Sequence, residues 1–258
     1  MLLIADTDNT EIYVNGNTTA IATIQAGEKY VLDGSQFTNN NLYIKTSKNV
    51  FAYQSIGGTT SNANQNLFFV PPLNCSTPKI VDNIPEINLI GSRNYVGVVN
   101  IVTETGATVL INDIPTTATP IPINGKPDFV YYSVSGLTGN IAVKSTKQVY
   151  VSYYGTNSAA TYGSYYSGFD IKPELSIANA TSVSGSCIPN ITLKTEPDVD
   201  YTYQWLNNGV DINGETGNTY TPLTPGYYQV KRSIPSCNTS NLSDKIPVSS
   251  SQGNLAFG

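Results

Sequence analysis

The residues with the most evident capacity for chemistry are six tyrosines gathered within 17 residues of the chain. They are interspersed with glycines and are Tyr150, Tyr153, Tyr154, Tyr162, Tyr165 and Tyr166. A tyrosine offers a broad apolar ring and a hydroxyl group and loses little rotamer entropy on binding, which suits sugar or protein surfaces. We therefore predict a ligand-binding site formed by Tyr154, Tyr162, Tyr165 and Tyr166. The alternative is that alternate tyrosines pack between strands of the two repeated units described below.

A short acidic run near the start of the chain is the second candidate site. Asp6, Asp8 and Glu11 could supply oxygen ligands to calcium, which prefers carboxylates at alternating positions. A polar hairpin turn accounts for the same run equally well. Calcium is the one metal considered, and no other cofactor is expected.

The residues needed for common catalytic centres are scarce. The chain has no histidine, which excludes Ser-His-Asp and Cys-His centres and any His-ligated zinc or copper site. Its three cysteines are too few for a zinc site with four thiolate ligands. Paired carboxylates remain open in principle, but no placement favours them. We predict that the chain is not an enzyme.

Charge and hydropathy exclude two further classes of partner. The formal net charge is −5, and the 13 basic residues are scattered, whereas binding to nucleic acid or to an anionic membrane needs clustered Lys and Arg. No apolar run reaches the roughly 18–20 residues of a spanning helix. We expect no nucleic-acid partner and no membrane insertion.

The elements that position these residues are strands, and the strands repeat. Only 12% of residues are charged, and Asn, Thr, Ser, Gly and Tyr, which favour strands and turns, are abundant. Residues 2–15 have the layout of residues 99–112, and residues 41–51 match residues 140–150. We predict an all-β fold in which a duplicated β-sandwich-like domain spans residues 1–170, with copies at about 1–90 and 91–170. Because the first strand starts at the very beginning, we also expect a longer parent protein.

The last third of the chain carries a different signature. Composition changes at about residue 170, and Cys187, Trp205, a tyrosine-rich strand at 226–230 and Cys237 then follow in immunoglobulin-like order. We predict an immunoglobulin-like β-sandwich over residues 171–250, followed by a linker or tail at 251–258.

The cysteines of this last third also bear on the compartment. A Cys187–Cys237 disulfide would close a loop of about 50 residues, worth roughly 4 kcal/mol, and would indicate an oxidising, extracellular setting. The alternative is two reduced, buried cysteines. Cys75 is either a small buried hydrophobe or the partner of a cysteine elsewhere.

Several of these segments resemble a known family. Residues 10–16, 26–30, 50–54 and 69–73 resemble the amino-terminal repeat region of IgG Fc-binding proteins, in the version found in very large bacterial surface proteins. Residues 203–209 and 226–230 look like the Ig-like modules of the same proteins. The resemblance implies an adhesin exported by the type IX secretion system of gliding bacteria.

Together these observations predict a non-enzymatic segment of a large, extracellular cell-surface adhesin that mediates cell adhesion or forms its stalk. Its expected partners are a surface glycan or protein ligand and the neighbouring domains of a longer chain. The first alternative is a carbohydrate-binding module of a secreted polysaccharide-degrading protein, in which exposed tyrosines would bind glycans. The second is a structural spacer without a ligand.

Overall fold

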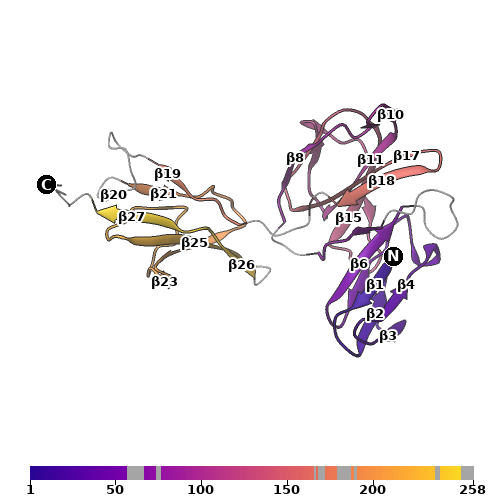
Figure 1. Cartoon of the computed structure of the whole chain (residues 1–258), viewed down its shortest axis with the longest axis horizontal. Helices are drawn as coiled ribbons and strands as arrows, with labels where there is room; N and C mark the ends of the chain where they lie inside the picture. The colour runs from indigo at the N-terminus through magenta and orange to yellow at the C-terminus, as the bar shows by residue number, and fades with distance from the viewer. Residues whose placement is uncertain are drawn as a thin grey trace. The chain divides into compact units, whose positions relative to one another are not determined.

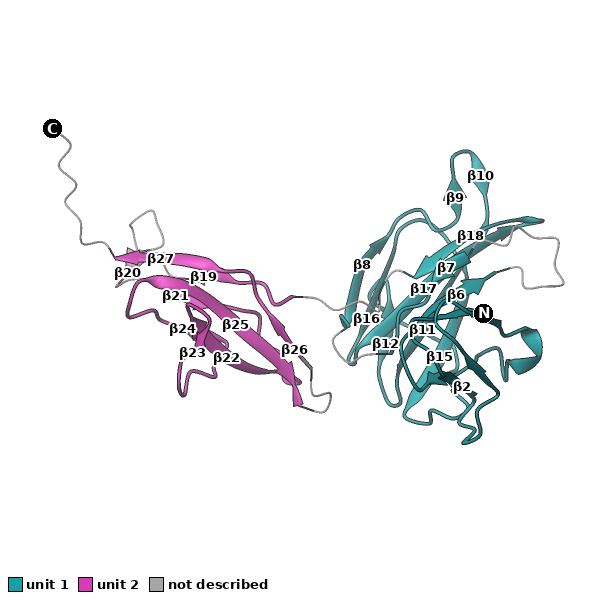
Figure 2. Ribbon diagram, turned by 60° about the horizontal axis from the view of Figure 1, so that its bottom comes forward, with its two compact units in different colours: residues 1–169 teal, residues 170–258 magenta. Residues whose placement is uncertain are grey.

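The structure is a computed structural model that describes residues 1–56, 67–73, 77–165, 167, 172–178, 187–188, 191–235 and 239–250. Within these ranges the chain forms strands and turns, with one 3-10 turn, η1 (Gly34–Gln36), so the all-β prediction is confirmed. No helix in the described ranges is long and apolar enough to cross a membrane. The chain divides into two compact units, unit 1 (residues 1–169) and unit 2 (residues 170–258), as Figure 2 shows.

Unit 1 begins with a small sandwich of two antiparallel sheets, the first copy. Sheet A has the order β4-β1-β6-β7 and consists of β1 (Leu2–Ala5), β4 (Lys29–Val31), β6 (Val50–Ser55) and β7 (Leu67–Phe69). Sheet B has the order β3-β2-β5 and consists of β2 (Thr10–Val14), β3 (Ala22–Ile24) and β5 (Ile44–Thr46). Alternate residues of these strands point between the sheets, and the core is Leu3, Ala5, Ile12, Val14, Ile24 and Leu32.

The second copy is a larger sandwich in the same unit. Sheet C has the order β14-β15-β11-β17-β18, from β11 (Val96–Glu104), β14 (Ile121–Pro122), β15 (Phe129–Leu137), β17 (Val149–Asn157) and β18 (Ala160–Tyr165). Sheet D has the order β13-β12-β16-β8, from β8 (Ile80–Ile84), β12 (Val109–Ile111), β13 (Ile114–Pro115) and β16 (Ile141–Ser145). A separate hairpin joins β9 (Leu89–Ile90) to β10 (Arg93–Asn94).

The strand order of sheet A recurs in sheet C. The series β4-β1-β6-β7 matches β15-β11-β17-β18, and Leu3 lies opposite Ala52 as Ile101 lies opposite Val151. Leu3 therefore corresponds to Ile101, 98 residues later, so the sequence alignment of the first strands at 97 residues is wrong by one position. Six residues separate Ala5 from Ile12 in the first copy, whereas five separate the equivalent residues Thr103 and Val109 in the second. This longer turn causes the shift in the alignment.

The boundary between the copies also differs from the one expected near residue 90. β8 precedes that position, yet it pairs with β16 and so completes sheet D of the second copy. The second sandwich therefore begins by Ile80. Its core takes Val81 and Ile84 from β8 together with Val99, Ile101 and Val151 of sheet C.

Unit 2 consists of two sheets (Figure 1), and Trp205, the single tryptophan of the chain, is fully buried in its core. Sheet E has the order β19-β21-β24, from β19 (Ser176–Ala178), β21 (Thr192–Lys194) and β24 (Thr219–Tyr220). Sheet F has the order β20-β27-β25-β22-β23, with β26 also on β25, from β20 (Cys187–Ile188), β22 (Thr202–Asn207), β23 (Val210–Asp211), β25 (Gly226–Ile234), β26 (Thr239–Leu242) and β27 (Ile246–Ser250). The core is Ile191, Leu193, Tyr203, Trp205, Tyr228, Val230 and Val248.

Candidate functional site

The tyrosines proposed as one site lie on β17 and β18 but on two faces of sheet C. Tyr154 lies opposite Gly163, two residues from Tyr165 on the same strand, so Tyr154 and Tyr165 share the outer face. Tyr162 lies opposite Gly155 and therefore points to the inner face. Tyr166 lies outside the described residues. The structure thus brings Tyr154 and Tyr165 to one face and separates Tyr162 from both.

Tyr165 packs against the first copy. Its ring centroid lies 5.9 Å from that of Phe68 on β7, and β7 and β18 run close together. Burial raises the pKa of Tyr165 to about 12, although a hydrogen bond with Ser152 opposes the shift, and burial also raises the pKa of Tyr154. Tyr165 therefore packs at the contact between the two copies.

Tyr162 belongs to a group of aromatic rings at one side of the second sandwich, which we call the tyrosine edge (Tyr95, Tyr153 and Tyr162). Its ring centroid lies 5.1 Å from that of Tyr95 and 6.1 Å from that of Tyr153. All three side chains are half-buried. Burial raises the pKa of Tyr162 to about 12, and its buried hydroxyl makes no hydrogen bond in the part of the chain that the structure describes.

The acidic run forms the turn between β1 and β2. Asp8 Oδ1 accepts a hydrogen bond from the Ala26 amide at 2.9 Å, and Glu11 Oε2 accepts one from the Tyr13 hydroxyl at 2.7 Å. Asp6 is exposed. Across the described ranges no three His, Cys, Asp or Glu side chains converge where a metal could be held. Calcium binding at Asp6, Asp8 and Glu11 stays a prediction, because these three side chains do not converge on one point.

The cysteine predictions fall largely outside the described residues. Only the backbone of Cys187 is described, and it lies on β20 opposite Ser249 of β27. Cys237 and Cys75 are outside the described residues. The disulfide stays a prediction.

Sequence reasoning missed the outer face of sheet A, which is apolar. One row crosses all four strands as Val31–Leu2–Tyr53–Phe69, and Ile4 lies beside Phe51 in the next row. Together with Leu67, these residues form what we call the open face: Leu2, Ile4, Val31, Phe51, Tyr53, Leu67 and Phe69. The unbroken apolar runs of β1 and β7 were the available signal, because a strand with only one buried face alternates.

The open face is exposed to an unusual extent for its composition. Phe51, Val31 and Leu67 are 52%, 55% and 57% exposed, and the Tyr53 and Phe69 rings meet edge to face at 5.9 Å. Of the outer positions on these four described strands, only Lys29 carries a charge. Contiguous exposed apolar patches of this kind are typical of surfaces that contact another molecule.

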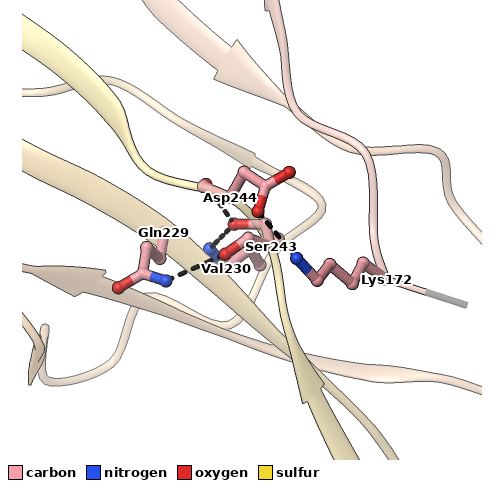
Figure 3. Close-up of polar contacts among 5 residues, drawn as sticks. All are labelled: Lys172, Gln229, Val230, Ser243 and Asp244. Atoms are coloured by element: carbon pink, nitrogen blue, oxygen red, sulfur yellow. Dashed lines mark hydrogen bonds and ion pairs between the residues drawn. The ribbon is translucent and has the colours of Figure 1, made fainter.

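Unit 2 has a cavity near its first residues whose lining includes Lys172 and Asp244. Figure 3 shows the polar contacts of these two residues. Lys172 Nζ lies 3.0 Å from Asp244 Oδ1, but both side chains are well exposed, so this ion pair adds little stability. The neighbouring Ser243 is buried, and its hydroxyl accepts a hydrogen bond from the Val230 amide at 2.9 Å and donates one to the Asp244 carbonyl. These contacts bridge the break between β26 and β27, so we assign this region a structural role.

Ser243→Ala is expected to lower the free energy of unfolding of unit 2 by about 1–3 kcal/mol, because the buried Val230 amide loses its acceptor. Trp205 is the single tryptophan of the chain and lies in the core of unit 2, so its fluorescence during urea unfolding reports this unit alone. Ser249→Ala, an exposed position on β27, is the control. Equal midpoints for the two variants would refute the assigned role.

Comparison with known proteins places unit 1 in a family. The sequence model of the family described as IgGFc binding protein matches residues 1–155. This match includes the first copy with its open face and most of the second copy, and it spans more than half of the chain. No curated protein matches the chain. The chain therefore belongs to the IgGFc binding protein family.

Proposed function

We propose that this chain is a non-enzymatic segment of a large, exported cell-surface protein, and that it attaches to a protein ligand through the open face of sheet A. The observation that carries the proposal is the apolar row Val31–Leu2–Tyr53–Phe69, with Phe51 and Leu67 beside it and more than half exposed. The family description, which names a protein ligand, supports a binding role. The resemblance to type IX-secreted adhesins of gliding bacteria supports the extracellular setting.

The open face has the composition of an interface centre. Aromatic residues dominate the binding energy of protein interfaces, and charged residues are depleted at their cores. Burying a Phe or Leu side chain completely contributes about 1.5–3 kcal/mol, so covering the exposed halves of Phe51 and Leu67 together contributes about that much. Contact energy of this size gives weak single attachments, which repeated presentation on a long protein turns into strong ones.

The proposal is tested by capture of chain-coated beads on a surface carrying IgG Fc, the ligand that the family description names. We expect the Phe51→Ser, Leu67→Ser double variant to lose at least about tenfold in affinity, because two exposed contact groups are removed. The matched control is Ile114→Ser, which replaces an apolar side chain that is 69% exposed on β13 of the second copy. Capture that survives the double variant would place the ligand site elsewhere.

A glycan is the second candidate ligand, and the aromatic content of the same face favours it. Phe51, Tyr53 and Phe69 lie on one side of sheet A, and flat aromatic surfaces suit the apolar faces of sugars. The same beads on a glycan array, with and without calcium, separate the two ligands. Loss of glycan capture in the double variant, without any Fc capture, would favour the carbohydrate-binding alternative. Beads that bind neither surface would favour the spacer.

We further propose that unit 2 is an immunoglobulin-like module that extends the segment as a stalk. Its two sheets, the parallel β20–β27 pair and the buried Trp205 on β22 support this assignment. The Tyr228 hydroxyl donates to the Thr224 carbonyl at 2.6 Å, four residues upstream, as in the tyrosine corner of such folds. Leu193 and Val230, both fully buried, pack with Trp205 in the core. The predicted Cys187–Cys237 disulfide would add to the stability that this core provides.

A further inference from the structure

The two copies of unit 1 meet through surfaces that are not equivalent. The first copy contributes Phe68 and Ile56, which point to the inner side of sheet A at its β7 edge. The second copy contributes the outer face of sheet C, where Phe68 meets Tyr165 and Ile56 Cδ1 lies over Gly163. The β7 edge of the first sandwich thus packs against the outer face of sheet C in the second sandwich. A contact between different surfaces of repeated units is heterologous, and it leaves one unused surface at each end.

The unused face is the open face of sheet A. Phe51 occupies the position in the first copy that Tyr150 occupies in the second. Phe51 follows Val50, which pairs with Ala5, and Tyr150 follows Val149, which pairs with Thr103, the equivalent of Ala5. Tyr150 is 4% exposed and Phe51 is 52% exposed. The open face is therefore much less buried than the outer face of sheet C at the same place in the fold.

The open face is also more apolar than the covered face to which it corresponds. In the row of sheet C equivalent to Val31–Leu2–Tyr53–Phe69, the residues are Ser133–Asn100–Ser152–Tyr165. Two aliphatic side chains and a tyrosine therefore stand in the first copy where the second has serines and an asparagine. The open face is thus the more apolar of the two equivalent faces, and large exposed apolar patches are typical of interaction surfaces.

The second copy has its own equivalent of the β7 edge, which makes no such contact within unit 1 among the described residues. The position of Phe68 is taken there by Ser164, because Gln54 pairs with Phe68 as Tyr153 pairs with Ser164. Around Ser164 lies the tyrosine edge, with its three half-buried rings. These rings of the second copy lie at the position that corresponds to the contact residues of the first copy, and they remain partly exposed. Such rings are suited to an apolar, aromatic partner.

We propose that the open face of one chain binds the tyrosine edge of a second copy of the same chain, head to tail. This inference rests on the proposed function only in taking the open face as a contact surface. The new contact continues the one within unit 1: first copy on second copy, then second copy on the first copy of the next chain. Such a head-to-tail association leaves one open face and one tyrosine edge unused at the ends of a linear assembly, so the assembly can grow with concentration.

Sedimentation velocity of the full chain over a wide range of concentration tests the proposal. We expect the wild-type sedimentation coefficient to rise with concentration. The face variant (Phe51→Ser, Leu67→Ser) and an edge variant (Tyr95→Ser) should each remain monomeric, with the association constant at least about tenfold lower. Ile114→Ser should behave as the wild type. Circular dichroism checks the fold of each variant, and Ser164→Arg replaces Tyr95→Ser if the latter lowers the melting temperature.

Mixing the two variants decides the geometry. A face variant retains a working edge and an edge variant retains a working face, so their equimolar mixture should form dimers that do not grow further. Self-association of the edge variant alone would overturn the proposal in favour of a symmetric face-to-face dimer. A monomeric wild type at every concentration would also overturn it, and Fc or glycan capture that still depends on Phe51 and Leu67 would then leave the proposed function standing.

Discussion

Gly125→Ala is expected to destabilise unit 1 severely, because the two copies approach each other there through their backbones. A Cβ atom on Gly125 would lie 2.2 Å from the Gly16 nitrogen and 2.3 Å from the Asn15 carbonyl carbon. The φ angle of Gly125 is +80°, a left-handed conformation that costs an alanine about 1–2 kcal/mol. Overpacking against backbone that has no side chain to rotate away adds about 1–3 kcal/mol.

Urea unfolding followed by far-ultraviolet circular dichroism measures this loss, and two internal comparisons isolate its cause. Gly106→Ala carries the same conformational cost, since φ is +84° and no atom lies within 4 Å of the added Cβ, so it should shift the transition of unit 1 much less. The Trp205 fluorescence transition should be unchanged in both variants, because Trp205 lies in unit 2. Equal shifts of the unfolding midpoint for Gly125→Ala and Gly106→Ala would show that the close approach of Gly125 to Gly16 does not contribute to the stability of unit 1.

Phe68→Ala is expected to lower the free energy of unfolding of unit 1 by about 3–5 kcal/mol, the usual range for removing a buried aromatic side chain. Phe68 is 9% exposed and fills the space between β7 and Tyr165 of the second copy. The neighbouring Phe69 is a matched control, because it points to the open face and is only partly buried. Phe69→Ala should therefore cost clearly less, and the reverse order would contradict the assignment of the two faces.

The same substitution should change the titration of Tyr165. Burial holds its pKa at about 12, above the ordinary value of 10.0, so the folded chain keeps a proton that the unfolded chain has lost. The stability that follows is fully present below pH 10 and is lost as the pH rises towards 12. In the Phe68→Ala variant the Tyr165 ring is more exposed and should ionise at lower pH. The difference in absorbance at alkaline pH between chains with Tyr165 and with Tyr165→Phe measures this ionisation. An unchanged titration would mean that Phe68 does not bury Tyr165.

Local features of this fold were predictable from the sequence, and the pairing of distant segments was not. Strand alternation and turn composition were enough to indicate an all-β chain with a repeat, because both depend on neighbouring residues. The alignment of Leu3 was off by one, because the length of a polar turn does not show where the strand before it pairs. Tyr162 and Tyr165 are three positions apart, so a regular strand must send them to opposite faces, and period-two reasoning could have separated them.

The open face was hidden for a different reason. Leu2, Ile4 and Phe69 look like core residues in the sequence, since apolar runs on short strands are typical of strands buried on both faces. Whether a second layer covers them depends on how the copies pack, and that contact joins β7 to a strand almost a hundred residues later. The acidic turn presents the opposite situation, since hydrogen bonds such as that from Ala26 to Asp8 already account for its side chains.

Hydroxyl-radical footprinting of the wild-type chain at low and high concentration, with oxidation of Phe51 and Tyr150 quantified by mass spectrometry against the unfolded chain, tests the central claim most directly. The two residues hold the same place in the two copies, and they are 52% and 4% exposed. We predict that Tyr150 is protected at both concentrations, whereas Phe51 is oxidised when the chain is dilute and becomes protected as the concentration rises. Similar oxidation of both residues, or oxidation of Phe51 that does not change with concentration, would contradict the account.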